Sequence, residues 1–193
     1  MNSDKKTAVI DNDFIEHVAS CNLSDDELID TLKIIISELE LDAVVHPLVC
    51  KHEVRKTVPR VKFLFDQNVF SEANYSFLDS DSAKKSYYCI LVAELYKSLT
   101  GENLPVTGER ILTFWVRLHS LGEIHSVSMC LICGSGIFLS DDKDSKKLKL
   151  LIEEKSLGSI EVYNRAELID EHLNKGETSI NRTIRRSLAH VRN

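Results

Sequence analysis

The chain has 193 residues, of which 43% are hydrophobic and 28% are charged, and its formal net charge at pH 7 is −6. This length fits one well-packed domain, the composition is that of a folded globular protein, and the acidic balance argues against broad, non-specific nucleic-acid binding. No apolar run approaches the roughly 20 residues that span a bilayer, and the amino-terminal residues lack the apolar segment of a secretion signal, so we expect a cytoplasmic protein without membrane contact.

Charge and cysteines are unevenly distributed. Acidic residues crowd the first fifty positions, whereas the stretch 181–193 contains four arginines and no acid. This gradient suits a nuclease with an acidic centre and basic flanks, and a solvated terminal helix fits the tail equally well. We expect residues 1–176 to form the domain and 177–193 a basic tail or helix. Cys130 and Cys133 form a C-x-x-C motif without a second ligand pair at zinc spacing, so we expect two core cysteines one helical turn apart.

The first sixty residues alternate between strand and helix patterns. Residues 7–11 form a short apolar run that ends in an acid, which is typical of a buried strand that delivers its last side chain to the edge of a sheet. Asn12 and Asp13 are both good helix N-caps and predict a helix that covers 14–20. The elements expected next are an amphipathic helix over 25–40, a strand over 42–47 and the beginning of a helix over 48–56.

Residues 60–120 contain few glycines and show no clear strand pattern. A capped helix that ends at Gly101 is predicted over 81–101, and another helix over 108–121. We therefore expect the stretch from about 56 to 120 to be a helical layer or insertion.

The last third alternates regularly between helix and strand patterns. The expected elements are a helix over 122–136 that glycines stop, a strand over 136–140, a helix over 141–155, a strand over 159–164 and a helix over 165–174. Strands that alternate with helices through short links pair in parallel by right-handed crossovers. The predicted fold class is therefore α/β, a three-layer sandwich with a small parallel sheet and a helical insertion in the middle.

Several acids are expected at one edge of this sheet. In an open parallel sheet the ligand site lies beyond the carboxyl ends of the strands. Asp11 ends the first predicted strand, and Asp141 and Asp142 end the strand over 136–140. Glu53 is expected in the first turns of the helix after the second strand, and Glu123 at the start of the helix that leads into 136–140. Clustered carboxylates repel one another unless cations neutralise them, and such oxygen-rich sites suit Mg²⁺ or Mn²⁺.

At these residues the chain resembles the PIN domain nucleases. AVIDNDFIEHV resembles the opening strand of the family, VVHPLVCKHEV the segment that supplies the second acid, and LGEIHSVSMCLICGSGIFLSDDKDSKKL the closing block. The resemblance covers residues 7–55 and 120–172. It departs from the family in a long helical stretch between the second and third acids, and in an extra acid at Asp13.

The resemblance implies hydrolysis of RNA with Mg²⁺ or Mn²⁺. The catalytic acids it implies are Asp11, Glu53, Glu123 and Asp142. The metal ligands would be Asp11, Glu123 and Asp142, with Asp141 as a rival for the last position; the pattern favours Asp142 as the ligand and Asp141 as the helix cap. The side chains expected around substrate or ligands are Asn12, Ser140, Lys143, Lys146, Lys147, Arg185 and Arg186. Many relatives are toxins that an antitoxin holds, so an antitoxin or another protein partner, and a homodimer, are also considered.

Two other functions fit parts of the sequence. Asp11 and Asp13 form a D-x-D that resembles the nucleophile motif of haloacid-dehalogenase-type phosphatases, but Ile15 departs from that family, and Glu53 and Glu123 would have no role. A PIN-like fold could also serve as a non-catalytic binding module. Among the dispersed histidines, His52 is a candidate for substrate contact because it stands beside Glu53, although neighbours on a helix point in different directions.

Overall fold

The computed structural model describes residues 5–78, 81–116, 120–134, 136–174 and 180–189. Its centre is a five-stranded, all-parallel sheet with the strand order β3-β2-β1-β4-β5. The strands are β1 (Lys6–Ile10), β2 (Leu41–Val45), β3 (Ser71–Glu72), β4 (Ile137–Leu139) and β5 (Glu161–Tyr163). The chain therefore builds the sheet outward in one direction from β1, and then crosses back to add β4 and β5 on the other side.

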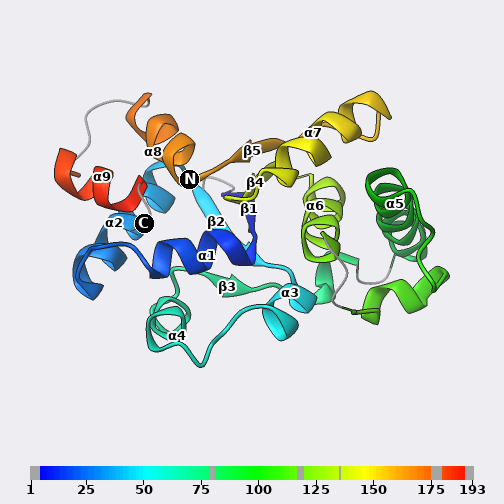
Figure 1. Cartoon of the computed structure of the whole chain (residues 1–193), viewed down its shortest axis with the longest axis horizontal. Coiled ribbons are helices and arrows are strands. Elements are labelled where there is room, and N and C mark those ends of the chain that lie inside the picture. Colours follow the sequence, from blue (N-terminus) through cyan, green and yellow to red (C-terminus); the bar gives the residue numbers. More distant parts are fainter. Residues whose placement is uncertain (1–4, 79–80, 117–119, 135, 175–179, 190–193) are drawn as a thin grey trace.

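Helices cover both faces of the sheet, which makes the molecule a three-layer α/β sandwich (Figure 1). The α-helices are α1 (Asn12–Ala19), α2 (Asp25–Glu38), α3 (Pro47–His52), α4 (Pro59–Asp66), α5 (Ser82–Thr100), α6 (Leu121–Cys133), α7 (Asp144–Glu154), α8 (Arg165–Asn174) and α9 (Arg182–Ala189). Two 3₁₀ helices, η1 (Tyr75–Leu78) and η2 (Gly108–Thr113), flank α5.

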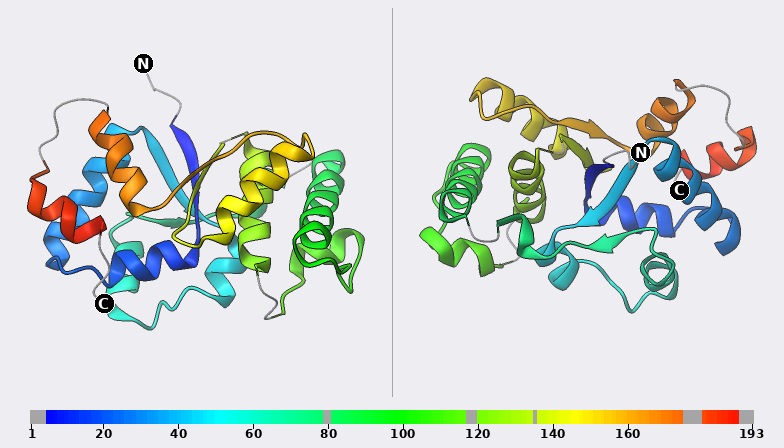
Figure 2. Two further views of the ribbon diagram at one scale, coloured as in Figure 1. Left: turned by 45° about the horizontal axis from the view of Figure 1, so that its top comes forward. Right: turned by 180° about the vertical axis from the view of Figure 1, so that it is seen from behind.

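The two faces of the sheet bury two separate cores. Successive side chains of a strand point to opposite faces, so Ala8 and Ile10 of β1 join the core beneath α1, α2, α4, α8 and α9, while Val9 joins the core beneath α5, α6 and α7. Figure 2 shows these two helix groups on either side of the strands. The fold class predicted from the sequence, an α/β sandwich with a small parallel sheet, is confirmed.

Local signals explain where several helices begin and end. Ser24 and Glu27 form a capping box at the start of α2. Gly101 ends α5 in the left-handed conformation, with φ 78°, as the sequence predicted. The basic tail contains a helix, α9, which packs on α2 and α8 and buries Leu188. No helix among the described residues is both long and apolar enough to cross a membrane.

The middle of the chain differs from the prediction. Residues 60–120 contain a strand, β3, which pairs with Val44 and Val45; two residues are too few to produce an alternating pattern. The helix predicted over 108–121 is wrong, because only the short η2 forms and Phe114 is already extended, with ψ 122°. Residues 117–119 of that prediction lie outside the described residues. Ser120, with φ 63°, then begins α6.

Three smaller expectations are corrected. The N-cap of α1 is Asp11 and not Asn12 or Asp13. The first strand ends one residue earlier than predicted, and the Asp11 side chain accepts the Asn12 N–H. Glu53 stands at the end of α3 and not in its first turns, because that helix is only six residues long. Of the C-x-x-C pair, Cys130 is buried and Cys133 is exposed, because Cys133 is the last residue of α6.

Candidate active site

Asp11 lies where the strand order of the sheet reverses. It follows β1 directly, and its backbone N–H donates to the carbonyl of Leu139, the last residue of β4, at 2.9 Å. Its side chain is 2% exposed. One carboxylate oxygen accepts the N–H of Asn12 at 2.8 Å, and the other accepts the hydroxyl of Ser140 at 3.1 Å. Ligands of open parallel sheets bind at such reversal points, beyond the carboxyl ends of the strands.

Ser140 connects Asp11 with Asp142. While its hydroxyl donates to Asp11, the same oxygen accepts the Asp142 N–H at 3.1 Å and the Ser145 hydroxyl at 2.6 Å. These bonds use the full donor and acceptor capacity of a hydroxyl. The side chain of Asp142 accepts the Asp144 N–H at the start of α7, at 2.8 Å. Ser140, which the resemblance places around substrate or ligands, therefore contacts the carboxylate of Asp11. Sequence reasoning missed Ser145, whose only signal was a small polar residue in the first turn of a helix.

Glu53 and Glu123 come together because α3 ends where α6 begins. The Glu53 carboxylate lies against Gly122, where an added Cβ would stand 2.5 Å from Glu53 Oε1. A side chain at position 122 would therefore displace the Glu53 carboxylate from this position. Glu123 follows in the first turn of α6, so its negative charge stands near that of Glu53.

Burial and mutual repulsion raise the pKa values of these acids. Burial raises the pKa of Asp11 well above its usual value, and the charges of Glu123, Glu53 and Asp13 raise it further. Burial, followed by the charges of Glu123 and Asp13, raises the pKa of Glu53 to about 7. Burial and the charge of Asp142 raise the pKa of Glu123 as well. Each of these acids is thus in a position where its ionised form is unfavourable.

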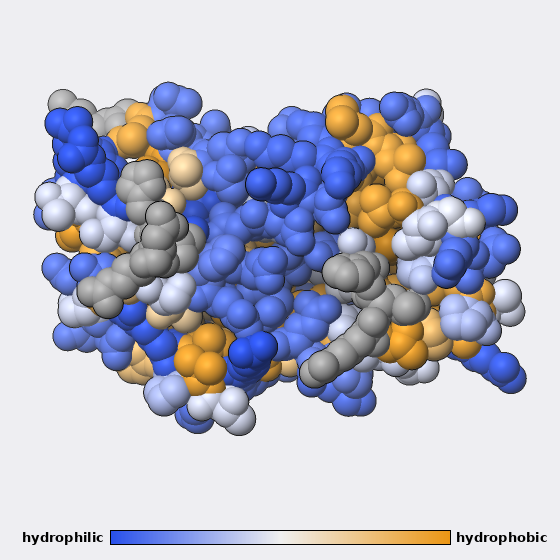
Figure 3. Space-filling view, viewed as in Figure 1, coloured by the Kyte–Doolittle hydropathy of each residue, from blue (hydrophilic) through white to orange (hydrophobic). Residues whose placement is uncertain are grey.

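Asp13 belongs to the same cluster. Its pKa is raised by burial and then by the charge of Asp142. The acid that appeared as a departure from the PIN pattern therefore takes part in the electrostatics of the site. The cluster, which we call the carboxylate cluster, consists of Asp11, Asp13, Glu53, Glu123 and Asp142. Figure 3 shows a broad hydrophilic area over the middle of the face on which α1 begins.

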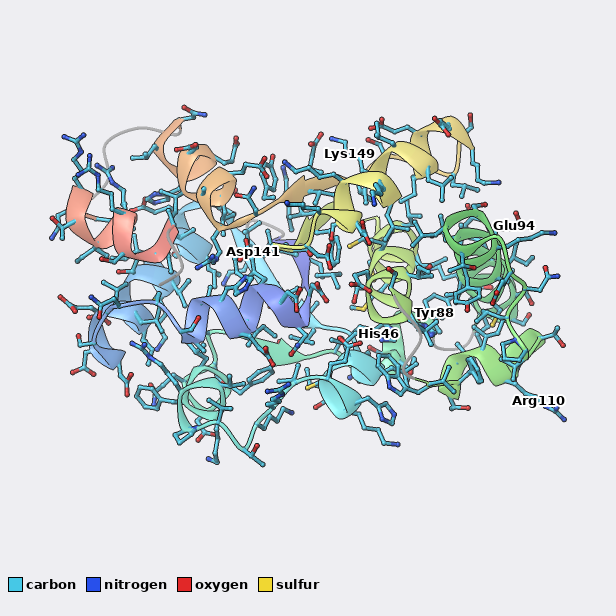
Figure 4. All side chains as sticks on the ribbon, viewed as in Figure 1. His46, Tyr88, Glu94, Arg110, Asp141 and Lys149 are labelled. Carbon is cyan, nitrogen blue, oxygen red and sulfur yellow. The ribbon has the colours of Figure 1, made fainter. Side chains whose placement is uncertain are left out.

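Asp141 points elsewhere. One of its oxygens accepts the backbone N–H of Arg165 at 3.0 Å; the other accepts the Arg165 side chain and lies 2.8 Å from His17 Nδ1. Figure 4 shows it between α1 and α8. Arg165 is itself buried, so Asp141 is neutralised within the fold. The expectation that Asp141 caps the helix after β4 is wrong, because Asp142 bonds that helix and Asp141 bonds the first residue of α8.

The remaining predicted residues are spread over the molecule. Asn12 is the first residue of α1, and its side-chain oxygen is buried without a hydrogen-bond partner among the described residues. Lys143 is exposed beside Asp142. Arg185 and Arg186 lie on α9, and Figures 1 and 2 place α9 near the far end of α1 from Asp11. The structure thus brings the acids together and keeps Arg185 and Arg186 apart from them.

The donor set of the cluster fits a hard divalent cation. It offers only carboxylate oxygens, with a serine hydroxyl and an amide oxygen beside them, and such ligands suit Mg²⁺ and Mn²⁺. Within the described residues, no group of three or more histidine, cysteine, aspartate or glutamate side chains is arranged to hold a metal ion as it stands. The side chains are therefore electrostatically coupled without forming a ready-made coordination shell.

A cavity of about 520 Å³ lies at the opposite edge of the sheet, beside the first residues of the strands. Its lining includes Lys6, Leu41, Glu161 and Glu171, and neither of these glutamates is buried. This cavity lacks the buried, like-charged groups that distinguish the carboxylate cluster. The cluster is the better candidate because its chemistry, rather than its volume, is unusual.

Comparison with known proteins identified no relative. No protein-family model matches the chain, and no curated protein and no solved structure is similar enough to count as a match.

Proposed function

We propose that the chain is a metal-dependent nuclease of the PIN type, which hydrolyses phosphodiester bonds in RNA at the carboxylate cluster with Mg²⁺ or Mn²⁺. One observation carries the proposal. Acids from separate segments of the chain converge where the strand order reverses, and burial and mutual repulsion raise the pKa values of Asp11, Glu53 and Glu123. This arrangement opposes folding unless cations or protons neutralise it, so its presence indicates a cation-binding role.

Asp11, Glu123 and Asp142 would hold the cation, with Glu53 and Asp13 beside them. A bound divalent cation supplies Lewis acidity toward a phosphodiester and a water with a lowered pKa. The hydroxyl of Ser140 fixes the orientation of Asp11 by its hydrogen bond, and Gly122 leaves room for the Glu53 carboxylate. Because the pKa of Glu53 is about 7, this residue carries a proton part of the time at neutral pH, and cation binding would displace that proton.

The RNA substrate, and a protein partner such as an antitoxin, are proposed on the family resemblance alone. The phosphatase alternative is weaker than the nuclease. It requires Asp11 as a free nucleophile, but the side chain is 2% exposed and both of its oxygens accept hydrogen bonds. It also leaves unexplained why Glu53 and Glu123 repel Asp11.

The test is cleavage of a mixed pool of single-stranded RNA in the presence of Mn²⁺. We expect Asp11→Asn to reduce the cleavage rate by about 100-fold or more, because it removes a carboxylate that would hold the cation, and the cation would stabilise the charge that develops on the phosphodiester. Asp26→Asn is the matched control: Asp26 is an exposed aspartate in the first turn of α2, and its variant should cleave as the wild type does. Equal cleavage by wild type and Asp11→Asn would refute the proposal, as would phosphatase activity without RNA cleavage.

A further inference from the structure

An aromatic pair includes His52, the residue that precedes Glu53 of the carboxylate cluster. The imidazole of His52 stacks on the indole of Trp115, with ring centroids 5.0 Å apart and planes inclined by 8°. His52 is the last residue of α3 and the neighbour of Glu53, while Trp115 lies in the extended segment that follows η2. The pair therefore joins two segments that both lead toward the acids.

The two rings differ in how firmly the fold holds them. Trp115 is partly buried and packs against both hydrophobic cores, so its position is defined by the sandwich. His52 is exposed, so the face of its ring that Trp115 does not cover is open to solvent. The result is a flat, solvent-facing ring with a fixed ring behind it. Nucleobases stack on surfaces of this kind with little dependence on sequence.

Two cationic residues lie within three positions of His52 in the chain. Lys51 precedes His52 and forms no ion pair with another described residue. The side chain of Arg55 is 72% exposed and, within the part of the chain that the structure describes, pairs with Glu16 at 3.5 Å. Single-stranded nucleic-acid sites combine stacking rings with cationic side chains that follow the backbone. In a protein of net charge −6, this local combination provides a place where a phosphate chain can approach the acids.

We propose that the His52–Trp115 pair is a stacking platform for an unpaired nucleobase. The base would lie on the open face of His52, with neighbouring phosphates near Lys51 and Arg55. A base within a duplex has both faces covered by its neighbours, so only an unstacked base can use this surface. The position of the platform next to the reacting phosphodiester rests on the proposed function, whereas base stacking itself does not.

The test measures binding separately from cleavage. A short, labelled, single-stranded RNA oligomer of mixed sequence is titrated in Mg²⁺ with Asp11→Asn protein, and its affinity is read by fluorescence anisotropy. Adding His52→Ala should weaken binding by about 5-fold to 150-fold, and His52→Phe should retain most of the affinity, because a phenyl ring replaces the imidazole as a flat surface. Trp115 is the single tryptophan of the chain, so its emission should change on binding.

Two controls separate stacking from folding. An abasic oligomer of the same length should bind equally weakly with and without His52→Ala, because it offers no base to stack. Tyr87→Ala, which removes an exposed aromatic ring of α5, should leave the affinity unchanged. Equal affinity of the oligomer for the His52 and His52→Ala proteins, or no measurable binding, would overturn the platform.

The outcomes also separate the platform from the nuclease. If wild-type protein fails to cleave RNA but His52→Ala weakens binding, the platform stands and the nuclease assignment is wrong. If wild-type protein cleaves RNA and His52→Ala binds as tightly as its parent, the nuclease stands and the platform is wrong.

Discussion

Glu53 lowers the stability of the fold when its carboxyl group is ionised. Its pKa rises from a usual value of 4.5 to about 7 in the folded protein, with burial as the main cause. A carboxyl whose pKa is higher in the folded than in the unfolded state does not destabilise the fold at a pH below its unfolded pKa. It destabilises the fold progressively as the pH rises from the unfolded pKa through the folded pKa. The cation-free protein should therefore lose stability between about pH 4.5 and pH 7 on account of this residue.

We predict that Glu53→Gln stabilises the cation-free protein near pH 8 by about 1–2 kcal/mol. This free energy is smaller than the full pKa shift would give, because the side chain is only partly buried and solvent screens its charge. Near pH 4 the variant and the wild type should be equally stable. Urea unfolding in EDTA at both pH values measures the difference. Glu94→Gln, on the exposed side of α5, is the matched control and should show no such pH dependence. A destabilised Glu53→Gln near pH 8 would contradict the repulsion.

Asp141 and Asp142 are adjacent in sequence but serve different ends. The Asp141 side chain, 10% exposed, pairs with Arg165, 6% exposed. Asp142 instead bonds the start of α7 and adds its charge to Asp13 and Glu123. We predict that Asp141→Asn costs about 3–5 kcal/mol of stability, because it leaves Arg165 with a buried, unpaired charge.

Asp142→Asn should cost far less stability and should abolish cleavage. The two variants are each other's control: urea unfolding ranks their stabilities, and RNA cleavage at a temperature where both remain folded ranks their activities. Loss of cleavage in a folded Asp141→Asn protein, together with retained cleavage in Asp142→Asn, would reverse the roles.

At the scale of elements, a buried hydrogen-bond chain joins the end of β2 to α5 and α6. The Tyr88 hydroxyl lies 2.8 Å from His46 Nε2 and 2.7 Å from His125 Nδ1, and all three side chains are buried. Figure 4 shows His46 and Tyr88 turned toward each other. Because His46 Nδ1 accepts the Leu48 N–H, its Nε2 carries the proton and donates to Tyr88, which then donates to His125.

Burial lowers the pKa of His46 well below its usual value and that of His125 to about 4, so both rings are neutral at physiological pH. The hydrogen bonds therefore run in one direction, from His46 through Tyr88 to His125. We predict that Tyr88→Phe costs about 1–3 kcal/mol, because it leaves buried groups of both histidines without this partner. Chemical denaturation is the measurement. The adjacent exposed Tyr87, as Tyr87→Phe, should change stability by no more than about 0.5 kcal/mol. An equally small effect of Tyr88→Phe would show that the hydrogen bonds among His46, Tyr88 and His125 contribute nothing to the stability of the fold.

At the scale of the whole molecule, we expect the proposed cation site to make the stability of the fold depend on cations. A cation that binds only the folded state stabilises it by about 2.7 kcal/mol when its concentration is 100 times its Kd. We predict that Mn²⁺ raises the Tm of the wild type, that EDTA reverses the rise, and that Asp11→Asn with Glu123→Gln abolishes it. Asp26→Asn should retain the full rise. Equal Tm values with Mn²⁺ and with EDTA would argue against a metal centre independently of any activity.

Several elements of the fold can be predicted from the sequence alone. The first strand, although it ends one residue earlier than predicted, the helix over 165–174 and the end of α5 at Gly101 were predictable, because apolar periodicity, capping residues and a left-handed glycine are local signals. The parallel sandwich followed from the alternation of such elements. Asp11 at the end of the first strand was predictable for the same reason.

What only the tertiary structure decided depends on contacts between distant segments. β3 becomes a strand because β2 offers it a partner, and residues 108–116 avoid the predicted long helix. Arg165 binds Asp141 although 24 positions of chain separate them, and Asp142 belongs to the cluster. From the sequence, either aspartate could have been the acid of the site. The stack of His52 on Trp115 and the approach of Glu53 to Gly122 likewise join positions far apart in the chain. Local patterns determine which elements form, but pairing, burial and repulsion between charges arise only when those elements pack.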